Sequence, residues 1–173
     1  MSIIDTLLTE LDQEAIATAR VLERVPQDQL SWKPHARSMS LGQLALHVAT
    51  IPGNIAELAS RDSIPEPPQF IQAEAETAAE LVPTLQASVA RARRILGGFD
   101  DAQMGATWRL MSGSHEIMAM PRAAMARMIM LNHWYHHRGQ LLVYLRMHDV
   151  PLPSVYGPTA DENPFVAQLA AAR

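Results

Sequence analysis

The chain has 173 residues, of which 48% are hydrophobic and 18% charged, and this composition is typical of a globular protein with a buried core. Its net charge of −4 gives no electrostatic reason to expect nucleic acid as a partner, and the lack of cysteine excludes disulfides, zinc–thiolate sites and cysteine nucleophiles. The acidic N-terminal stretch and the lack of a long apolar run predict a cytoplasmic protein with no signal peptide and no membrane span.

The first half of the chain is predicted to contain two helices. Apolar residues recur at helical spacing over residues 3–25, which predicts a first helix that Pro26 ends. Ser40 and Gln43 match a capping box, so we expect a second helix to begin at Leu41 and run to residue 60. Its Pro52–Gly53 pair predicts a kink or a break. The proline-rich residues 64–70, "IPEPPQF", are predicted to form an extended linker.

The second half is predicted to add two more helices. The third begins near Ile71 and ends at Gly97 and Gly98. Residues 106–120 are expected to form a short hairpin around Ser112–Gly113, or a loop. The fourth helix spans residues 121–149, with Pro121 in its first turn. A loop-like tail and a short helix over residues 165–173 complete the chain. We therefore predict an all-α fold, an antiparallel four-helix bundle formed by a single domain over residues 1–173.

Three histidines carry the strongest functional pattern. His133 and His137 are one helical turn apart on one face, the spacing at which two imidazoles share a metal ion. His47 lies on the apolar face of the second helix, so all three are expected to point inward. Buried histidines satisfied by hydrogen bonds or water are the alternative interpretation. A shared cation would satisfy three imidazole nitrogens at once, and three ligands leave a position open, as in catalytic sites.

Two nearby residues are candidates for catalytic or orienting roles. Gln140, one turn beyond His137, is expected to orient a ligand or a bound water. The fourth helix has no carboxylate beside the histidines, so a general base would have to come from elsewhere, for instance Glu57.

The other notable residues of this region have structural interpretations. We expect His136 beside a metal ligand or at a subunit contact, with a role as a ligand itself as the alternative. Arg138 is expected on the far side of the helix, in a salt bridge or an interface. Gly139 predicts a close helix approach. The arginines of "RARR" are expected at a solvated helix end. The remaining histidines are predicted to be surface residues: His35, His115 and His148.

The segment "HWYHHRGQL", residues 133–141, resembles the signature of the DinB/YfiT-like metalloenzyme family. Residues 32–47, "WKPHARSMSLGQLALH", resemble the first motif of that family, and residues 150–162 resemble the tail of one branch. The resemblance implies a four-helix bundle, often a homodimer, with a divalent metal held by His47, His133 and His137. Characterised members include thiol-dependent transferases and a mycothiol-dependent isomerase, while most have no assigned reaction. The resemblance therefore implies a metal site and leaves the substrate open.

Two functions remain open from the sequence. Imidazole ligands suit several transition metals, with zinc or nickel as the expected ion, which could lower the pKa of a bound water toward about 7 or hold a small thiol as thiolate. One function is a divalent-metal-dependent enzyme, of thiol-dependent transferase or hydrolase type, acting on an unidentified small molecule. Since the chain has no cysteine, a low-molecular-weight thiol would be a cosubstrate. The alternative is a non-enzymatic or stress-linked binding module with a structural or regulatory metal.

Overall fold

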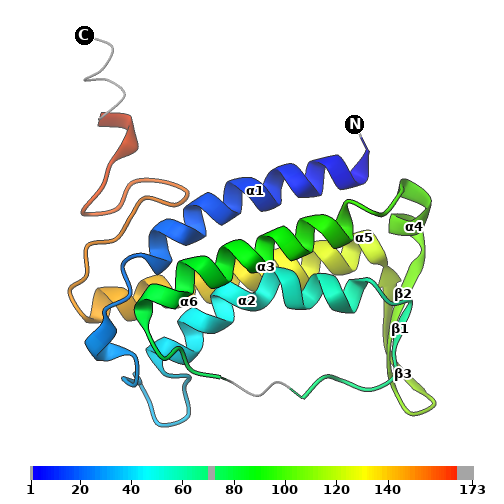
Figure 1. Cartoon of the computed structure of the whole chain (residues 1–173), viewed down its shortest axis with the longest axis horizontal. Coiled ribbons are helices and arrows are strands. Elements are labelled where there is room, and N and C mark those ends of the chain that lie inside the picture. The colour runs from blue at the N-terminus through cyan, green and yellow to red at the C-terminus, as the bar shows by residue number, and fades with distance from the viewer. Residues whose placement is uncertain (1, 70–72, 167–173) are drawn as a thin grey trace.

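Four helical segments lie alongside one another in the computed structural model, which describes residues 2–69 and 73–166 (Figure 1). They are α1 (Ile3–Leu22), α2 (Leu41–Ala59), α3 (Leu81–Leu96) and a last segment made of α5 (Arg122–Met125), η3 (Ala126–Asn132) and α6 (His133–Met147). The connections carry the short helices η1 (Gln27–Gln29), η2 (Ala78–Glu80) and α4 (Asp101–Gly105). Within the described residues, no helix is long and apolar enough to cross a membrane.

The start of α2 is fixed by local hydrogen bonds. The Ser40 hydroxyl accepts from the Gln43 backbone amide at 3.1 Å, and the Gln43 side chain accepts from the Ser40 amide at 2.9 Å. This capping box confirms the predicted first residue, Leu41. The helix then continues through Pro52 to Ala59. The ribbon bends partway along without a break (Figure 1), so of the two outcomes predicted at Pro52 only the kink is seen.

Contacts between the helices show that the bundle is not fully antiparallel. On α2 and α3, the Ser88 hydroxyl contacts Thr50 and Gly53, whereas Arg91 pairs with Glu57, so the residue numbers rise together and these two helices run parallel. Helices α1 and α3 are antiparallel, because Asp12 pairs with Arg93 whereas the Ile3 amide donates to Asp101, just beyond α3. The last helical segment is antiparallel to α2, because Trp134 donates to the Val48 carbonyl and Arg122 to that of Ala59. The predicted antiparallel topology is therefore wrong for α2 and α3. Their connection is a long crossover that returns along the bundle (Figure 1).

A small sheet closes one end of the bundle. Strands β2 (Thr107–Ser112) and β3 (His115–Pro121) form the predicted hairpin, and Gly113 in its turn has a φ of 58°. Strand β1 (Ser63–Ile64) pairs with β2 in parallel, through Ser63 with Arg109 and Ile64 with Leu110. The sheet order is β1-β2-β3. The fold is therefore mostly helical with a small mixed sheet, and the all-α prediction was wrong in this respect.

The third helix begins later than predicted. The short helix η2 comes first, and α3 starts directly after it at Leu81. This start is ten residues after the predicted one at Ile71, which lies outside the described residues. Before η2, the Ser40 hydroxyl donates to the carboxylate of Glu74, which fixes this stretch against the start of α2. Pro83 falls in the first turn of α3, where proline is tolerated, and the helix shows no irregularity there. Its predicted end at Gly97 is confirmed.

The last helical segment is continuous from Arg122 to Met147, with a π-helical stretch, η3, in the middle. Pro121 ends β3 and precedes the first helical residue, one position before the predicted place. Buried Arg122 anchors this end by donating to the Ala59 carbonyl at 2.7 Å and to Asp62 at 2.5 Å. The tail is loop-like as predicted. Residues 164–166 are helical, and the rest of the predicted C-terminal helix lies outside the described residues.

Candidate metal centre

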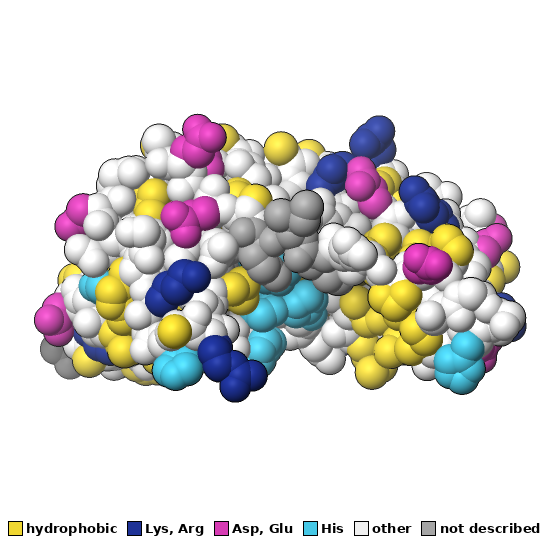
Figure 2. All heavy atoms as spheres, turned by 90° about the horizontal axis from the view of Figure 1, so that it is seen from below, with side chains coloured by type: hydrophobic (Ala, Val, Ile, Leu, Met, Phe, Trp, Pro, Cys, Tyr) yellow, Lys and Arg dark blue, Asp and Glu magenta, His cyan; other side chains and the backbone are white. Residues whose placement is uncertain are grey.

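The structure brings together the three histidines singled out in the sequence. His47 comes from α2, and His133 and His137 from the first turns of α6. The Nε2 atoms of His47 and His133 are 3.4 Å apart, and one ring nitrogen from each of the three residues lies within 4.8 Å of the others. Figure 2 shows histidine side chains gathered in a hollow near the middle of one face. The three rings are half-buried at the edge of the bundle, so they are less deeply buried than predicted.

The arrangement fits a divalent metal ion. Two ligands of a tetrahedral zinc with bonds of about 2.0–2.1 Å lie about 3.4 Å apart, which is the separation of the His47 and His133 nitrogens. Within residues 2–69 and 73–166, this is the one group of three or more histidine, aspartate or glutamate side chains whose ligand atoms lie this close together. The donor set that the structure describes is therefore three imidazoles with no carboxylate.

Burial keeps the three imidazoles neutral. Desolvation lowers the pKa of His47 to about 4, with further lowering by the nearby His137 and His133. Desolvation is also the main cause that lowers the pKa of His133, against a hydrogen bond to the backbone of Ile129. The pKa of His137 is lowered in the same way. At pH 7 all three rings therefore have lone pairs available, as metal ligands require.

Gln140 determines which nitrogen of His137 faces the other two histidines. Its Oε1 lies 2.8 Å from Nδ1 of His137, and because an amide oxygen only accepts, Nδ1 must carry the proton. The lone pair is then on Nε2. Gln140 therefore contacts a candidate metal ligand, and its orienting role stays a prediction.

Glu57, the candidate base, does not join the histidines. It lies ten residues after His47 on α2, about 15 Å along the helix axis. Its carboxylate is exposed and pairs with Arg91 of α3 at 3.2 Å. His136 is exposed and its ring packs against that of His137, with the centroids 4.9 Å apart. It therefore lies next to a candidate ligand, as expected.

Behind the histidines lies a polar network that the sequence indicated only in part. Arg138 is buried on the far side of α6 and pairs with Glu14 of α1 at 2.6 Å, which confirms the predicted salt bridge. It also donates to the hydroxyls of Thr18 at 2.9 Å and Tyr156 at 2.6 Å. The residues from α1 and from the tail are far from Arg138 in sequence, so no local pattern could identify them.

Two predictions next to this network were wrong. A Cβ added to Gly139 would have no neighbour within 4 Å in this chain, so Gly139 does not mark a close helix approach. His148 is half-buried rather than at the surface, because its ring packs edge-on against Trp32 with the centroids 4.3 Å apart. The exposed positions predicted for His35 and His115 are confirmed, although His115 lies in β3.

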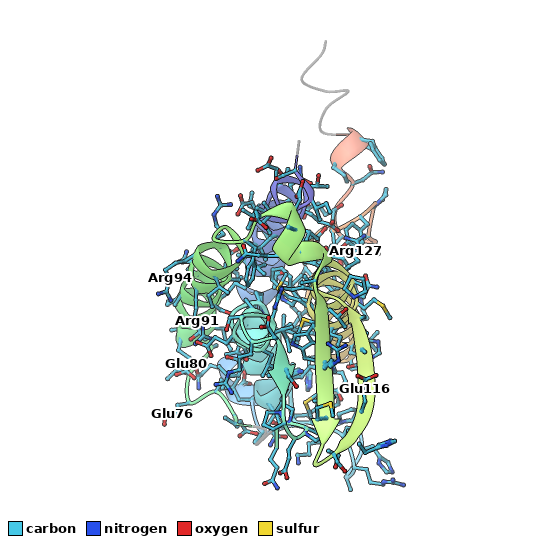
Figure 3. All side chains as sticks on the ribbon, turned by 90° about the vertical axis from the view of Figure 1, so that its right-hand side faces the viewer. Glu76, Glu80, Arg91, Arg94, Glu116 and Arg127 are labelled. Atoms are coloured by element: carbon cyan, nitrogen blue, oxygen red, sulfur yellow. The ribbon has the colours of Figure 1, made fainter. Side chains whose placement is uncertain are left out.

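The arginines of "RARR" lie near the end of α3, where Arg93 and Arg94 are exposed and Arg91 is half-buried. Two of them are paired. Arg91 bonds Asn54 at 2.8 Å and Glu57, and Arg93 pairs with Asp12 of α1. Figure 3 shows Arg91 and Arg94 on the opposite side of the molecule from Arg127. Arg91 and Arg93 therefore link α3 to neighbouring helices, and the cluster does not form one basic surface with Arg127.

Comparisons with known proteins agree with this fold. The sequence matches the DinB family over residues 1–164. The structure is similar to that of a DinB-like protein from Bacillus cereus, with a TM-score of 0.67 and 19% identity, covering 88% of this chain and 97% of the other. A DinB-like protein from Bacillus subtilis gives a TM-score of 0.65 and 18% identity, covering 87% and 96%. A comparison with curated proteins finds no match. The match over nearly the whole sequence shows that this chain belongs to the DinB family.

Proposed function

We propose that this protein is a divalent-metal-dependent enzyme acting on a small molecule, with a zinc or nickel ion held by His47, His133 and His137. Its reaction is of the thiol-dependent transferase or the hydrolase type. The observation that carries the proposal is the donor set: three imidazole nitrogens that converge within 4.8 Å, half-exposed and without a fourth ligand among the described residues. Structural zinc sites are closed by four protein ligands, whereas catalytic sites keep a position for water or substrate.

The charge of the site favours an anionic ligand. Three neutral imidazoles leave the full charge of a divalent cation uncompensated, since the described cluster contains no carboxylate. A thiolate or a carboxylate on the substrate would supply that charge. When bound, the ion would act as a Lewis acid that stabilises such an anion at neutral pH. Because the chain has no cysteine, a thiolate would come from a low-molecular-weight thiol cosubstrate.

Gln140 is proposed as a positioning residue rather than as an acid or base. Its 2.8 Å contact with Nδ1 of His137 holds the ring so that Nε2 faces His47 and His133. Supporting hydrogen bonds of this kind contribute about 10–100-fold in metal affinity. Gln140→Leu should lower zinc affinity by that factor, whereas Gln86→Leu, at an exposed position of α3, should leave it unchanged.

Metal content tests the ligand set. Elemental analysis of tag-free protein loaded with zinc should give close to one ion per chain, lost in His47→Ala, His133→Ala and His137→Ala. His115→Ala, an exposed histidine on β3, is the matched control and should retain the ion. Failure of the wild type to bind zinc or nickel would refute the proposal and leave these histidines as half-buried packing residues.

An enzyme and a protein with a structural metal differ in whether the metal has an open coordination position, and this can be measured. Protein loaded with cobalt(II) should change its visible absorption spectrum when 2-mercaptoethanol is added, because the thiolate enters the coordination sphere. A spectrum of a four-coordinate ion that is unaffected by thiol, carboxylate or pH would indicate a closed sphere. That result would favour the non-enzymatic alternative, a binding module with a structural or regulatory metal.

A further inference from the structure

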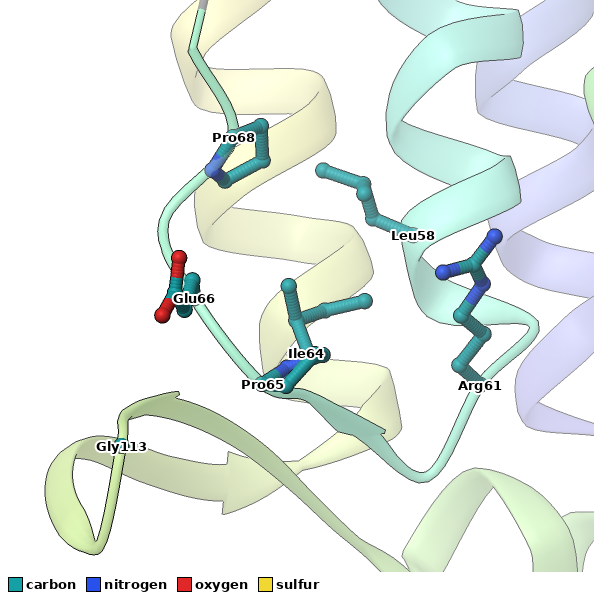
Figure 4. A pocket seen from close by; sticks show the side chains of 7 residues that line it. All are labelled: Leu58, Arg61, Ile64, Pro65, Glu66, Pro68 and Gly113. Carbon is teal, nitrogen blue, oxygen red and sulfur yellow. The ribbon is translucent and has the colours of Figure 1, made fainter.

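A pocket of about 510 Å³ lies between the end of α2, strand β1 and the turn of the hairpin. Its volume falls within the range of small-molecule sites. Figure 4 shows Leu58, Ile64 and Pro68 around the space between α2 and the chain that follows β1. The walls are mainly apolar, and Arg61 and Glu66 complete the lining together with Pro65 and Gly113. We call this the hairpin pocket.

The sheet gives the hairpin pocket a fixed apolar wall. Ile64 is 3% exposed and its backbone pairs with Leu110, which in turn pairs with Met118 across the hairpin. Residues directly opposite one another in neighbouring strands project from the same face, so these three side chains form a row. Leu110 and Met118 are only half-buried. The row therefore leaves apolar surface beside the pocket that the described chain does not cover.

The hairpin pocket lies on the same helix face as the metal centre. Leu58 follows His47 by eleven residues on α2, which is three full turns and about 20° around the axis, and about 16 Å along it. Figure 2 shows apolar side chains on the same face of the molecule as the histidine hollow. A ligand held at the histidines and lying along α2 would reach Leu58.

The charges at the pocket favour an uncharged occupant. Arg61 and Glu66 carry opposite charges, and neither forms an ion pair with any residue that the structure describes. Their charges cancel at the rim, whereas the side chains that form the pocket wall are aliphatic. Binding an apolar group against such a wall is favourable, whereas burying a charge there costs free energy.

We propose that the hairpin pocket binds the apolar body of the substrate, while an anionic headgroup of the same molecule occupies the metal centre. The substrate class is therefore an amphiphile: a thiol or an acyl derivative with a metal-binding head and an extended apolar chain. This inference rests on the proposed function for the headgroup, but the pocket itself can be tested without metal.

A chain-length series tests the proposal. Zinc-loaded protein is titrated with n-alkyl hydroxamates from acetyl to hexadecanoyl, with calorimetry as the readout. We expect the affinity to rise about fourfold for each methylene once the chain reaches the pocket. Leu58→Asn should abolish that rise and leave acetohydroxamate binding unchanged. Ile117→Asn, an exposed apolar residue on β3 outside the pocket, is the matched control and should behave as the wild type.

A second measurement separates the two proposals. Methyl resonances of Leu58 and Ile64 are followed in metal-free protein as decanoate is added, with butyrate as the short control. Shifts with decanoate alone support the pocket, even if no hydroxamate binds and the proposed function fails. Binding of acetohydroxamate without any gain from longer chains, or a gain that Leu58→Asn does not change, would overturn the hairpin pocket as a subsite and leave the proposed function standing.

Discussion

Arg138 follows His137 in the chain, but its side chain lies on the opposite side of α6 and contacts α1. Its side chain is 2% exposed and that of Glu14 is 12% exposed, so the ion pair between them is almost fully desolvated. Donation to Thr18 and Tyr156 satisfies more of the guanidinium. Because these partners lie on α1 and on the tail, the network fixes the rotation of α6 about its own axis. That rotation directs His133 and His137 toward α2.

Removing one partner of this pair should be costly. Arg138→Met leaves the Glu14 carboxylate buried without a cation, and we expect the free energy of unfolding to fall by about 3–5 kcal/mol. Arg93→Met, which breaks the exposed pair with Asp12, should cost less than about 1 kcal/mol. Urea unfolding of the metal-free variants measures both. The double variant Glu14→Leu/Arg138→Met should recover part of the loss, and equal effects of the two single substitutions would contradict the assignment.

The neutral histidines make stability depend on pH. The pKa of His47 is lowered from 6.5 to about 4 in the folded protein, mainly by burial. Between these values the unfolded chain binds more protons than the folded chain, so acidification from pH 6.5 favours unfolding. The free energy of unfolding of the metal-free protein should fall with a slope of at most about 1.4 kcal/mol per pH unit for this residue.

Urea unfolding at a series of pH values, with a chelator present, measures that slope. His47→Gln should give a shallower dependence between pH 6.5 and 4.5 because it removes a group that titrates differently in the two states. His115→Gln is the control, since His115 is exposed on β3. Identical slopes for the wild type and His47→Gln would show that burial does not lower the pKa of this ring.

At the scale of elements, α2 and α3 pack closely against each other at Gly53. A Cβ added to Gly53 would lie 2.6 Å from Nε of Arg91 and 2.9 Å from the Ser88 carbonyl oxygen, whereas Gly139 on α6 has open space. We expect Gly53→Ala to cost about 1–3 kcal/mol through overpacking. Gly139→Ala should instead stabilise the protein by about 0.5–1 kcal/mol, because alanine is the better helix former.

Thermal unfolding of the two glycine variants provides the comparison. Both substitutions add one methyl group to a helix interior, so a difference in sign isolates the packing of α3 against α2. If Gly53→Ala were as stable as the wild type, α3 would have to be able to move away from α2 without cost. The hydrogen bond from the Gly53 amide to Ser88 at 2.8 Å argues against that freedom.

The elements that could be predicted are those set by neighbours in sequence. Ser40 and Gln43 are three residues apart, so their capping box is visible in the chain and marks the start of α2. The start of α3 could not be read in this way. The composition of the residues before α3 favours a helix. The hydrogen bond from Ser40 to Glu74, 34 residues away in the chain, instead holds them against the start of α2. Strand β1 has two residues, and pairing with β2 alone makes it a strand.

The same distinction applies to the candidate metal centre. His133, His137 and Gln140 share a helix, so their spacing alone placed them together. His47 was added because it lies on an apolar face, and the packing of α2 against α6 brings it to the pair. Glu57 lies on the same helix as His47, but its position depends on α3, where Arg91 binds it. Helix direction could not be predicted, since a long linker permits either orientation.

At the scale of the whole molecule, apolar side chains remain exposed on the outer face of the last helical segment. Met128 is 55% exposed, Val143 59% and Met147 55%. Val143 and Met147 are one turn apart on α6. Together with the family resemblance, this stripe supports the proposal that the protein forms a homodimer through α6.

Substitution of this stripe tests the proposed dimer. Val143→Asp with Met147→Lys should shift the molecular mass measured by sedimentation from two chains to one, because charges would be buried at the contact. Ile16→Asp, at an apolar residue of α1 that is 68% exposed, is the control and should leave the mass unchanged. A wild type that sediments as one chain at high concentration would refute the dimer.

The π-helical stretch η3 immediately before His133 has a consequence for how this chain tolerates a change in length. A π turn holds about one residue more than an α turn. Deleting one residue within Ala126–Asn132 would let the stretch close into regular α-helix while Arg122 at one end and Arg138 at the other keep their anchors. The α-helix between His133 and His137 has no extra residue to lose. A deletion there would rotate one histidine about the helix axis by about 100° relative to the other. We therefore expect this chain to tolerate the deletion of one residue ahead of the first histidine, but not between the two histidines.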